Sequence, residues 1–294
     1  MASQNEHVTT RTLRRWGLPD PGGSKYDRGT VLVAGGARRT PGAVMLAGTA
    51  ALRVGAGRLM LGVADSVATA VAVAVPEAGV VPLPETATGS ISGDAPAALI
   101  PELGHVRALL VGTGLDDVDT AREIVAQLAH VTPDPLVVVL DAFALGAIAH
   151  DADLVRPLRG RLILTPNPAE IEILLGSGDL DPARPGEFRD AAQEIASQYD
   201  AVIATQAFVA APNGTALTLD VGGPGLGTSG SGDVLAGAIA GFAARGVPPL
   251  HAAAWGTYVH AAAGDDLARG TAGLGYLARE LPERFPTVIA RVLE

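Results

Sequence analysis

Short apolar segments recur along this chain, and each is followed by glycine or by a segment with helical periodicity. "GTVLVAGG" (29–36) leads into "PGAVMLAGTAALRVG" (41–55), whose apolar residues fall at helical spacing. Apolar strands that alternate with helices are typical of a parallel sheet covered on both faces. The other strand segments that we predict are 57–64, 107–114, 136–145, 160–167, 200–212 and 215–220, and the other helical segments lie near 118–130, 169–175, 188–199, 232–245 and 250–268.

The segment 200–220 does not fit this alternation. Its two apolar runs, 200–212 and 215–220, are joined by Pro-Asn-Gly, which favours an antiparallel hairpin added to the sheet. No repeat, low-complexity linker or break in composition divides the chain. We therefore predict an α/β fold with a mostly parallel central sheet and an antiparallel hairpin in its C-terminal half, built by a single domain over 29–294. An N-terminal arm, 1–28, is expected to be irregular.

Composition and charge exclude several classes of protein. The 294 residues carry a net charge of −10 without a basic stripe, so no nucleic-acid partner is expected. The longest apolar stretch, 67–84, is interrupted by Pro76 and Glu77, which argues against a membrane span. Cysteine is absent and no secretory signal pattern is present, so we expect a cytoplasmic protein. Lys25 is the single lysine, and no lysine beyond it can serve a phosphate.

Ligands of open α/β sheets bind beyond the carboxyl ends of the strands, so chemistry is expected in the turns that follow them. The strongest candidate is "GLGTSGSGDVLAG" (225–237). Its glycines at 227, 230 and 232 precede an apolar run that predicts a helix, whose free N–H groups would attract phosphate oxygens. Asp233 lies in the first helical turn. These residues alone support a phosphate site and a plain helix cap equally.

Two other glycine-containing turns follow predicted strands. "GGARRTPGAV" (35–44) is neither a GxGxxG motif nor a Walker A loop. Arg38 and Arg39 make phosphate contact possible there, but a structural turn is supported at least as well. Gly112 and Gly114 follow the strand "RALLV" and permit close backbone contact with a ligand.

Polar side chains at further strand ends have both a functional and a structural interpretation. Asp141 ends a strand, where it would meet a ligand or cap the next helix. Thr165, Asn167 and Glu170 lie in the Pro-rich turn "TPNPAE", in which Glu170 is alternatively a first-turn acid. His260, on an Ala-rich helix, is expected to be a core histidine. The spacing of the histidines offers no zinc motif.

Taken in this order, the motifs resemble the ADP/ATP-dependent NAD(P)H-hydrate dehydratases of the ribokinase-like superfamily. The resemblance runs from about Lys25 to Glu294, nearly the whole chain. It implies a ribokinase-like αβα sandwich and the ADP- or ATP-dependent dehydration of the S form of hydrated NADH or NADPH. The segments that carry it are "GTVLVAGGARRTPGAVMLAGTAALRVGAG", "VAVPEAGVV", "LLVGTGL", "VVLDAFAL", "LTPNPAEIEILLG", "GLGTSGSGDVLAGAIAGFAARG", "HAAAWGTYVHAAAGD" and "GLGYLARELPERFP".

The resemblance also implies roles for single residues. Asp233 would take or orient the proton of the substrate hydroxyl. Mg²⁺ would arrive with the nucleotide, without direct protein ligands. The nucleotide-binding residues implied are Gly230, Ser231, Gly232, Thr165, Glu170 and Gln206. Those implied for the hydrated dinucleotide are Ala43, Gly112, Gly114, Asn167 and Asp141.

Two positions depart from the family pattern. Asn167 stands where many relatives have His, which keeps a hydrogen bond but removes a protonatable group. Relatives usually carry a Lys-Gly pair beside the nucleotide phosphates, in the hairpin where this chain has Thr205 and Gln206. Gln206 would donate a neutral hydrogen bond, about half as strong as a charge-assisted one. A catalytically weakened nucleotide-binding relative is therefore one alternative, and a vitamin-precursor or sugar-like kinase of the same superfamily is another.

The resemblance extends to partners. Relatives suggest a homo-oligomer, a tetramer. Relatives often carry a hydratase-epimerase domain in the same chain, and 294 residues leave no room for one, so we expect a separate epimerase protein.

Overall fold

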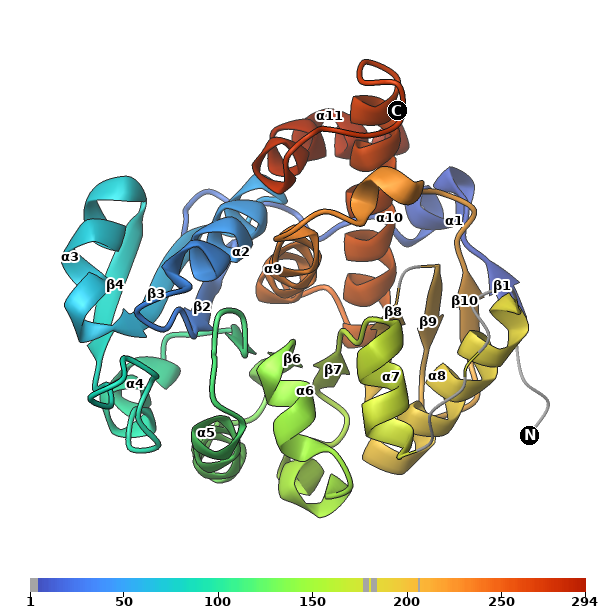
Figure 1. Cartoon of the computed structure of the whole chain (residues 1–294). Coiled ribbons are helices and arrows are strands. Elements are labelled where there is room, and N and C mark those ends of the chain that lie inside the picture. Colours follow the sequence, from blue (N-terminus) through green and yellow to red (C-terminus); the bar gives the residue numbers. More distant parts are fainter. Residues whose placement is uncertain (1–4, 177–179, 181–183, 206) are drawn as a thin grey trace.

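A computed structural model of the protein describes residues 5–176, 180, 184–205 and 207–294. In this part of the chain the strands form one sheet in the order β1-β10-β9-β8-β7-β6-β5-β2-β3-β4 (Figure 1). All neighbouring pairs are parallel except those that β9 makes with β8 and β10. The strands are β1 (Asn5–His7), β2 (Thr30–Ala34), β3 (Arg58–Ala64), β4 (Ala78–Leu83), β5 (Ala108–Val111), β6 (Val137–Leu140), β7 (Leu162–Leu164), β8 (Val202–Thr205), β9 (Phe208–Ala210) and β10 (Ala216–Thr218).

Helices cover both faces of the sheet, as Figure 1 shows. One layer contains α1 (Thr10–Trp16), α2 (Pro41–Arg53), α9 (Ser231–Ala244), α10 (Pro249–Ala268) and α11 (Leu281–Leu293), with α3 (Asp65–Ala74) beside β3 and β4. The other contains α4 (Pro96–Leu103), α5 (Val118–Val131), α6 (Phe143–Ile148), α7 (Pro168–Leu175) and α8 (Pro185–Tyr199). Short 3₁₀ turns are η1 (Ala152–Leu158), η2 (Pro224–Leu226) and η3 (Ala278–Glu280).

Alternation of side chains along the strands supplies both layers with a core. On β2, Val31 and Val33 pack into the core beneath α2 and α9, whereas Leu32 and Ala34 pack into the core on the opposite face. Successive side chains of a strand point to opposite faces, so an entirely apolar strand can seal two helical layers. This confirms the parallel sheet covered on both sides.

Helix α9 is the central helix of its layer and lies on the sheet between the helices α2 and α10. Two of its glycines lie one turn apart against α2. A Cβ at Gly237 would stand 2.1 Å from the carbonyl oxygen of Ala47, and one at Gly241 would stand 2.7 Å from that of Ala51. Glycine is required there by the close approach of the two helices, and this packing fixes where α9 begins.

The strand order reverses at β2, which pairs with β3 on one side and β5 on the other. The chain leaves β2 towards β3 and β4, and then returns to build β5 to β8 on the opposite side. Such a switch point opens a crevice at the carboxyl ends of the two strands, where doubly wound proteins bind ligands. The site is therefore expected beyond β2 and β5.

The structure corrects several expectations. The run 200–212 is two strands, β8 and β9, because the chain reverses between them. Pro-Asn-Gly does form the predicted turn, between β9 and β10, with Gly214 at φ 88°. The prediction of an irregular arm is wrong for residues 5–16, because β1 pairs with β10 and α1 packs against α11. Besides β1 and α1, the strands and α-helices that we did not predict are β4, α3, α4, α6 and α11.

Candidate active site

The predicted site residues come together at the carboxyl edge of the sheet. Gly112, Asp141 and Thr165 directly follow the neighbouring parallel strands β5, β6 and β7. Helix α9 begins at the same edge, and the charge of Asp233 raises the pKa of Asp141. Four separate segments of the sequence thus supply one region, because parallel strands end on the same side.

The start of α9 has open N–H groups. Gly230 is its cap residue, with φ 88°, and no side chain caps the helix. The N–H of Ser231 is already bonded, to the carbonyl oxygen of Thr228 at 3.1 Å. The N–H groups of Gly232 and Asp233 have no hydrogen-bond partner among the described residues, and the anion site expected at residues 230–232 stays a prediction.

Gly230 and Gly232 differ in what a side chain at each position would contact. At Gly230 the positive φ favours glycine, and a Cβ would meet Leu46 at 2.5 Å. At Gly232 a Cβ would meet no atom within 4 Å. A glycine inside a helix costs about 0.5–1 kcal/mol relative to alanine. Nothing in the protein's own packing explains Gly232.

Asp233 is half-buried in the first turn of α9. Burial raises its pKa to about 6. At pH 7 its carboxylate is then ionised by about ten to one and has a basicity close to that preferred for a general base. Asp233 can therefore accept a proton near neutral pH.

Asp141 is buried, and the hydroxyl of Thr165 donates to its Oδ1 at 2.7 Å. Burial first, and then the charges of Asp233 and Glu170, raise the pKa of Asp141 to about 7, against the hydrogen bond from Thr165. The next residue, Ala142, has φ 50°, a backbone conformation that costs a non-glycine residue about 1–3 kcal/mol. Asp141 and Thr165 are thus bonded to each other, and their predicted ligand contacts stay predictions.

Asn167 and Glu170 form a capping box at the start of α7. The amide oxygen of Asn167 accepts from the N–H of Glu170 at 3.0 Å, and the carboxylate of Glu170 accepts from the N–H of Asn167 at 2.9 Å. Burial raises the pKa of Glu170. The structural interpretation of Glu170 as a first-turn acid is confirmed, and a role in ligand binding stays a prediction for both.

His260 is the partner of Ser231 that the sequence did not indicate. Its Nε2 lies 2.9 Å from the Ser231 hydroxyl oxygen, and burial lowers the pKa of the ring to about 4. The imidazole is neutral at pH 7, which confirms the core histidine. The hydroxyl of Ser231 therefore points into the protein and holds α9 to α10.

Gly112 and Gly114 are required by packing between turns. A Cβ at Gly112 would stand 1.8 Å from the carbonyl oxygen of Asp141. One at Gly114 would stand 2.6 Å from that of Thr40 and 3.0 Å from the Cβ of Ala43. Gly114 thus lies against Ala43, whereas Gly112 lies against Asp141, and substrate binding by Ala43, Gly112 and Gly114 stays a prediction.

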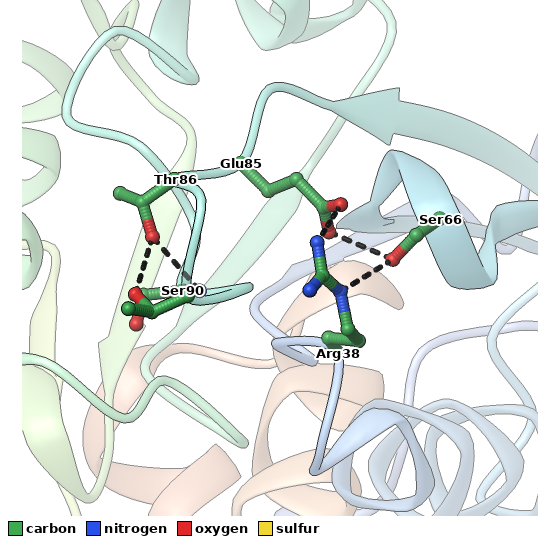
Figure 2. A network of polar contacts seen from close by, with 6 residues as sticks. Arg38, Ser66, Glu85, Thr86 and Ser90 are labelled. Carbon is green, nitrogen blue, oxygen red and sulfur yellow. Dashed lines mark hydrogen bonds and ion pairs between the residues drawn. The ribbon is translucent and has the colours of Figure 1, made fainter.

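Cations are scarce at this edge. Arg38 is held in a network with Glu85 and Ser66, which Figure 2 shows, so it supports the structural interpretation of its turn. The backbone of Lys25 packs against Gly57, before β3, at the other edge of the sheet. Gln206 lies outside the described residues. Within the described ranges, no cluster of three or more His, Asp or Glu side chains could hold a metal ion, and no helix is long and apolar enough to cross a membrane.

A sequence model of the family described as NAD(P)H-hydrate dehydratase matches residues 31–287. The chain belongs to this family. An "ADP-dependent (S)-NAD(P)H-hydrate dehydratase" of Xanthomonas campestris is 42% identical, over 97% of this chain and 96% of the relative. A "Bifunctional NAD(P)H-hydrate repair enzyme Nnr" of Moorella thermoacetica is 36% identical, and the match covers 99% of this chain but 55% of that longer relative.

Solved structures agree with this membership. A dehydratase of Bacillus subtilis, described as ADP/ATP-dependent and co-crystallised with ATP and Mg²⁺, superposes with a TM-score of 0.77 at 26% identity, over 99% of each chain. A ribokinase-like protein of Enterococcus faecalis has a TM-score of 0.79 at 21% identity, over 98% of this chain and 96% of its own. The ribokinase-like αβα sandwich is thereby confirmed.

Proposed function

We propose that this protein is a lyase that dehydrates the S form of hydrated NADH or NADPH, with ADP or ATP as phosphoryl donor. The observation that carries the proposal is Asp233 in the first turn of α9, beside the open N–H groups of residues 232 and 233. A proton acceptor next to an anion site is the arrangement that phosphoryl transfer to a hydroxyl requires.

The residues suit the following reaction. Asp233 takes the proton of the ring hydroxyl while the hydroxyl oxygen attacks the terminal phosphorus of the nucleotide, which leaves as AMP from ADP or as ADP from ATP. The N–H groups of Gly232 and Asp233 hold the phosphoryl oxygens as their charge shifts. The C–O bond of the phosphate ester then breaks, driven by the lone pair of the ring nitrogen, and phosphate leaves. Loss of a ring proton completes NADH or NADPH.

The rest of the site supports this arrangement indirectly. The bond between Ser231 and His260 fixes the start of α9. Thr165 holds Asp141, and the capping box of Asn167 and Glu170 fixes the neighbouring helix start. Mg²⁺ would neutralise charge on the nucleotide phosphates and be carried by the nucleotide's own oxygens. Gln206, in the hairpin segment where relatives usually carry a Lys-Gly pair, remains part of the proposed nucleotide site.

A turnover assay tests the proposal. Wild-type protein with hydrated NADH or NADPH, Mg²⁺ and either ADP or ATP should restore the absorbance of the reduced ring, and Asp233→Asn should abolish the gain. A stable phosphorylated alcohol without recovery of the reduced dinucleotide would instead support a small-molecule kinase. Nucleotide binding without any turnover would support the weakened relative.

Cellular context completes the proposal. The absence of cysteine fits a cytoplasmic location. We expect a homo-oligomer, a tetramer, and a separate epimerase that converts the other form of the hydrate, since the longer Moorella relative is described as bifunctional.

A further inference from the structure

Two adjacent arginines, Arg38 and Arg39, lie in the turn between β2 and α2, at the switch point of the sheet. The two arginines differ in their partners. Arg38 is bonded on several sides, and Arg39 is exposed and has no hydrogen bond or ion pair with any residue that the structure describes. A pair that is identical in sequence is therefore divided between two roles.

Arg38 is fixed by partners that follow β3 and β4. Its guanidinium lies 2.6 Å from Oε1 of Glu85, and its Nε donates to the hydroxyl of Ser66 at 3.3 Å. Ser66 in turn donates to Oε2 of Glu85 at 2.8 Å, which closes the triangle seen in Figure 2. These bonds hold the pKa of Glu85 below its usual range, and the bond from Arg38 has the largest effect. The charge of Arg38 is thus compensated within the protein.

The support beneath Arg38 is a tight turn, 85–91. The N–H of Arg38 donates to the carbonyl oxygen of Gly89 at 3.0 Å. Gly89 has φ 96°, and a Cβ there would meet the Cβ of Arg38 at 2.8 Å. Thr86 closes the turn through bonds to Ser90 (Figure 2). The buried side chain of Ile91 anchors the turn in the core.

The other side of the turn is bonded to the strand end after β5. Gly36 and Ala37 donate their N–H groups to the carbonyl oxygens of Thr113 and Gly114 at 3.0 and 2.8 Å. The hydroxyl of Thr40 donates to Gly114 at 2.7 Å. The backbone on both sides of residue 39 is therefore fixed at the crevice where the fold binds ligands.

An uncompensated guanidinium in this position indicates an anionic ligand group. Guanidinium matches phosphate in shape and hydrogen bonding, and its charge is permanent. The start of α9 meets α2 at Leu46, five residues beyond the first residue of α2, or about 7.5 Å at 1.5 Å per residue. Arg39 precedes α2, so this part of the helix separates it from the start of α9, where we place phosphoryl transfer.

We propose that Arg39 binds a phosphate group of the dinucleotide substrate, and that Arg38, through Glu85 and Ser66, is the positioning residue that holds the turn for it. This inference rests on the proposed function for the identity of the dinucleotide. The phosphate is either the diphosphate bridge, common to NADH and NADPH, or the 2′-phosphate of NADPH alone.

Binding of the products NADH and NADPH, measured by calorimetry without turnover, tests the proposal. Arg39→Gln should weaken binding of at least one of them about 10- to 100-fold, the range of a charged hydrogen bond. Loss for NADPH alone assigns the 2′-phosphate, and loss for both assigns the diphosphate. The matched control is Arg53→Gln, an exposed arginine at the far end of α2, which should change neither affinity.

The positioning role has its own readout. Glu85→Gln should weaken dinucleotide binding several-fold in the wild type and have no further effect in Arg39→Gln, because both changes remove the same contact. The proposal would be overturned if Arg39→Gln bound both dinucleotides with unchanged affinity, or if Arg53→Gln lost as much affinity as Arg39→Gln. It would also be overturned if Arg39→Gln lost affinity for ADP alone. Wild-type protein that binds the dinucleotides without dehydrating their hydrates would refute the proposed function alone, and wild-type protein that binds neither would refute this inference.

Discussion

The hydroxyl oxygen of Ser231, the first residue of α9, lies 2.9 Å from Nε2 of the buried His260 on α10. This contact joins two segments almost thirty positions apart and turns a serine of the glycine-rich turn into a structural group. The backbone N–H groups of the next two residues have no partner among the described residues, and they are the part of α9 that we propose binds the nucleotide.

Ser231→Ala should lower the free energy of unfolding by about 1–3 kcal/mol, because it removes the partner of a buried nitrogen. Urea unfolding followed by circular dichroism measures the change. Ser229→Ala, in the same turn but exposed, is the matched control and should stay within about 0.5 kcal/mol of the wild type. Equal stability of both variants would show that the contact with His260 contributes nothing.

Asp233→Asn should lower kcat by about 10²–10⁴-fold, the usual contribution of a general base. In the wild type, kcat/KM should fall as the pH drops below about 6, because protonation of Asp233 removes the proton acceptor. Initial rates between pH 5 and 8 measure both effects. Glu77→Gln, which removes an exposed carboxylate elsewhere, should leave the rates unchanged; activity retained in Asp233→Asn would contradict the assigned role.

Gly232→Ala and Gly230→Ala should have opposite effects on stability. Alanine at 232 meets open space and should stabilise the helix by up to about 1 kcal/mol, while its methyl group raises KM for the nucleotide. Alanine at 230 must adopt a positive φ against Leu46 and should destabilise by about 1–3 kcal/mol. Thermal unfolding and nucleotide titrations measure the pair. A Gly232→Ala protein with unchanged KM would remove the argument for close ligand approach.

The unfolding free energy of Asp141→Asn, relative to that of the wild type, should increase as the pH rises. The pKa of Asp141 is raised from its ordinary 3.8 to about 7, so the folded state binds more protons than the unfolded state between these values. The unfolding free energy of the wild type therefore falls over this range, and asparagine, which keeps an oxygen for Thr165, has no such loss. Unfolding curves at pH 5, 6, 7 and 8 measure the difference between the proteins. Parallel pH profiles would contradict the raised pKa.

Much of the fold could be predicted because local pattern and global structure agree. Apolar strands such as 30–34 have no solvent-facing side, which leaves a sheet covered on both faces as the one place for them. The position of Asp141 at a strand end and of Asp233 in a first helical turn also follows from short-range pattern. The reversal between β8 and β9 does not, because no glycine or proline marks a turn between residues 201 and 211, and the division of this run depends on pairing with β10.

The sequence by itself determined the class of fold, the turns that carry chemistry and the acid to test first, since each depends on residues close together in the chain. Only the tertiary structure decided which polar groups are already occupied. Asp141 is bonded to Thr165, Ser231 to His260 and Arg38 to Glu85, through partners on other elements. Arg39 differs from Arg38 in no way that sequence pattern reveals. The carboxyl ends of β3 and β4 bring Ser66 and Glu85 to one arginine and leave the other uncompensated, and that choice is made by the packing of the sheet.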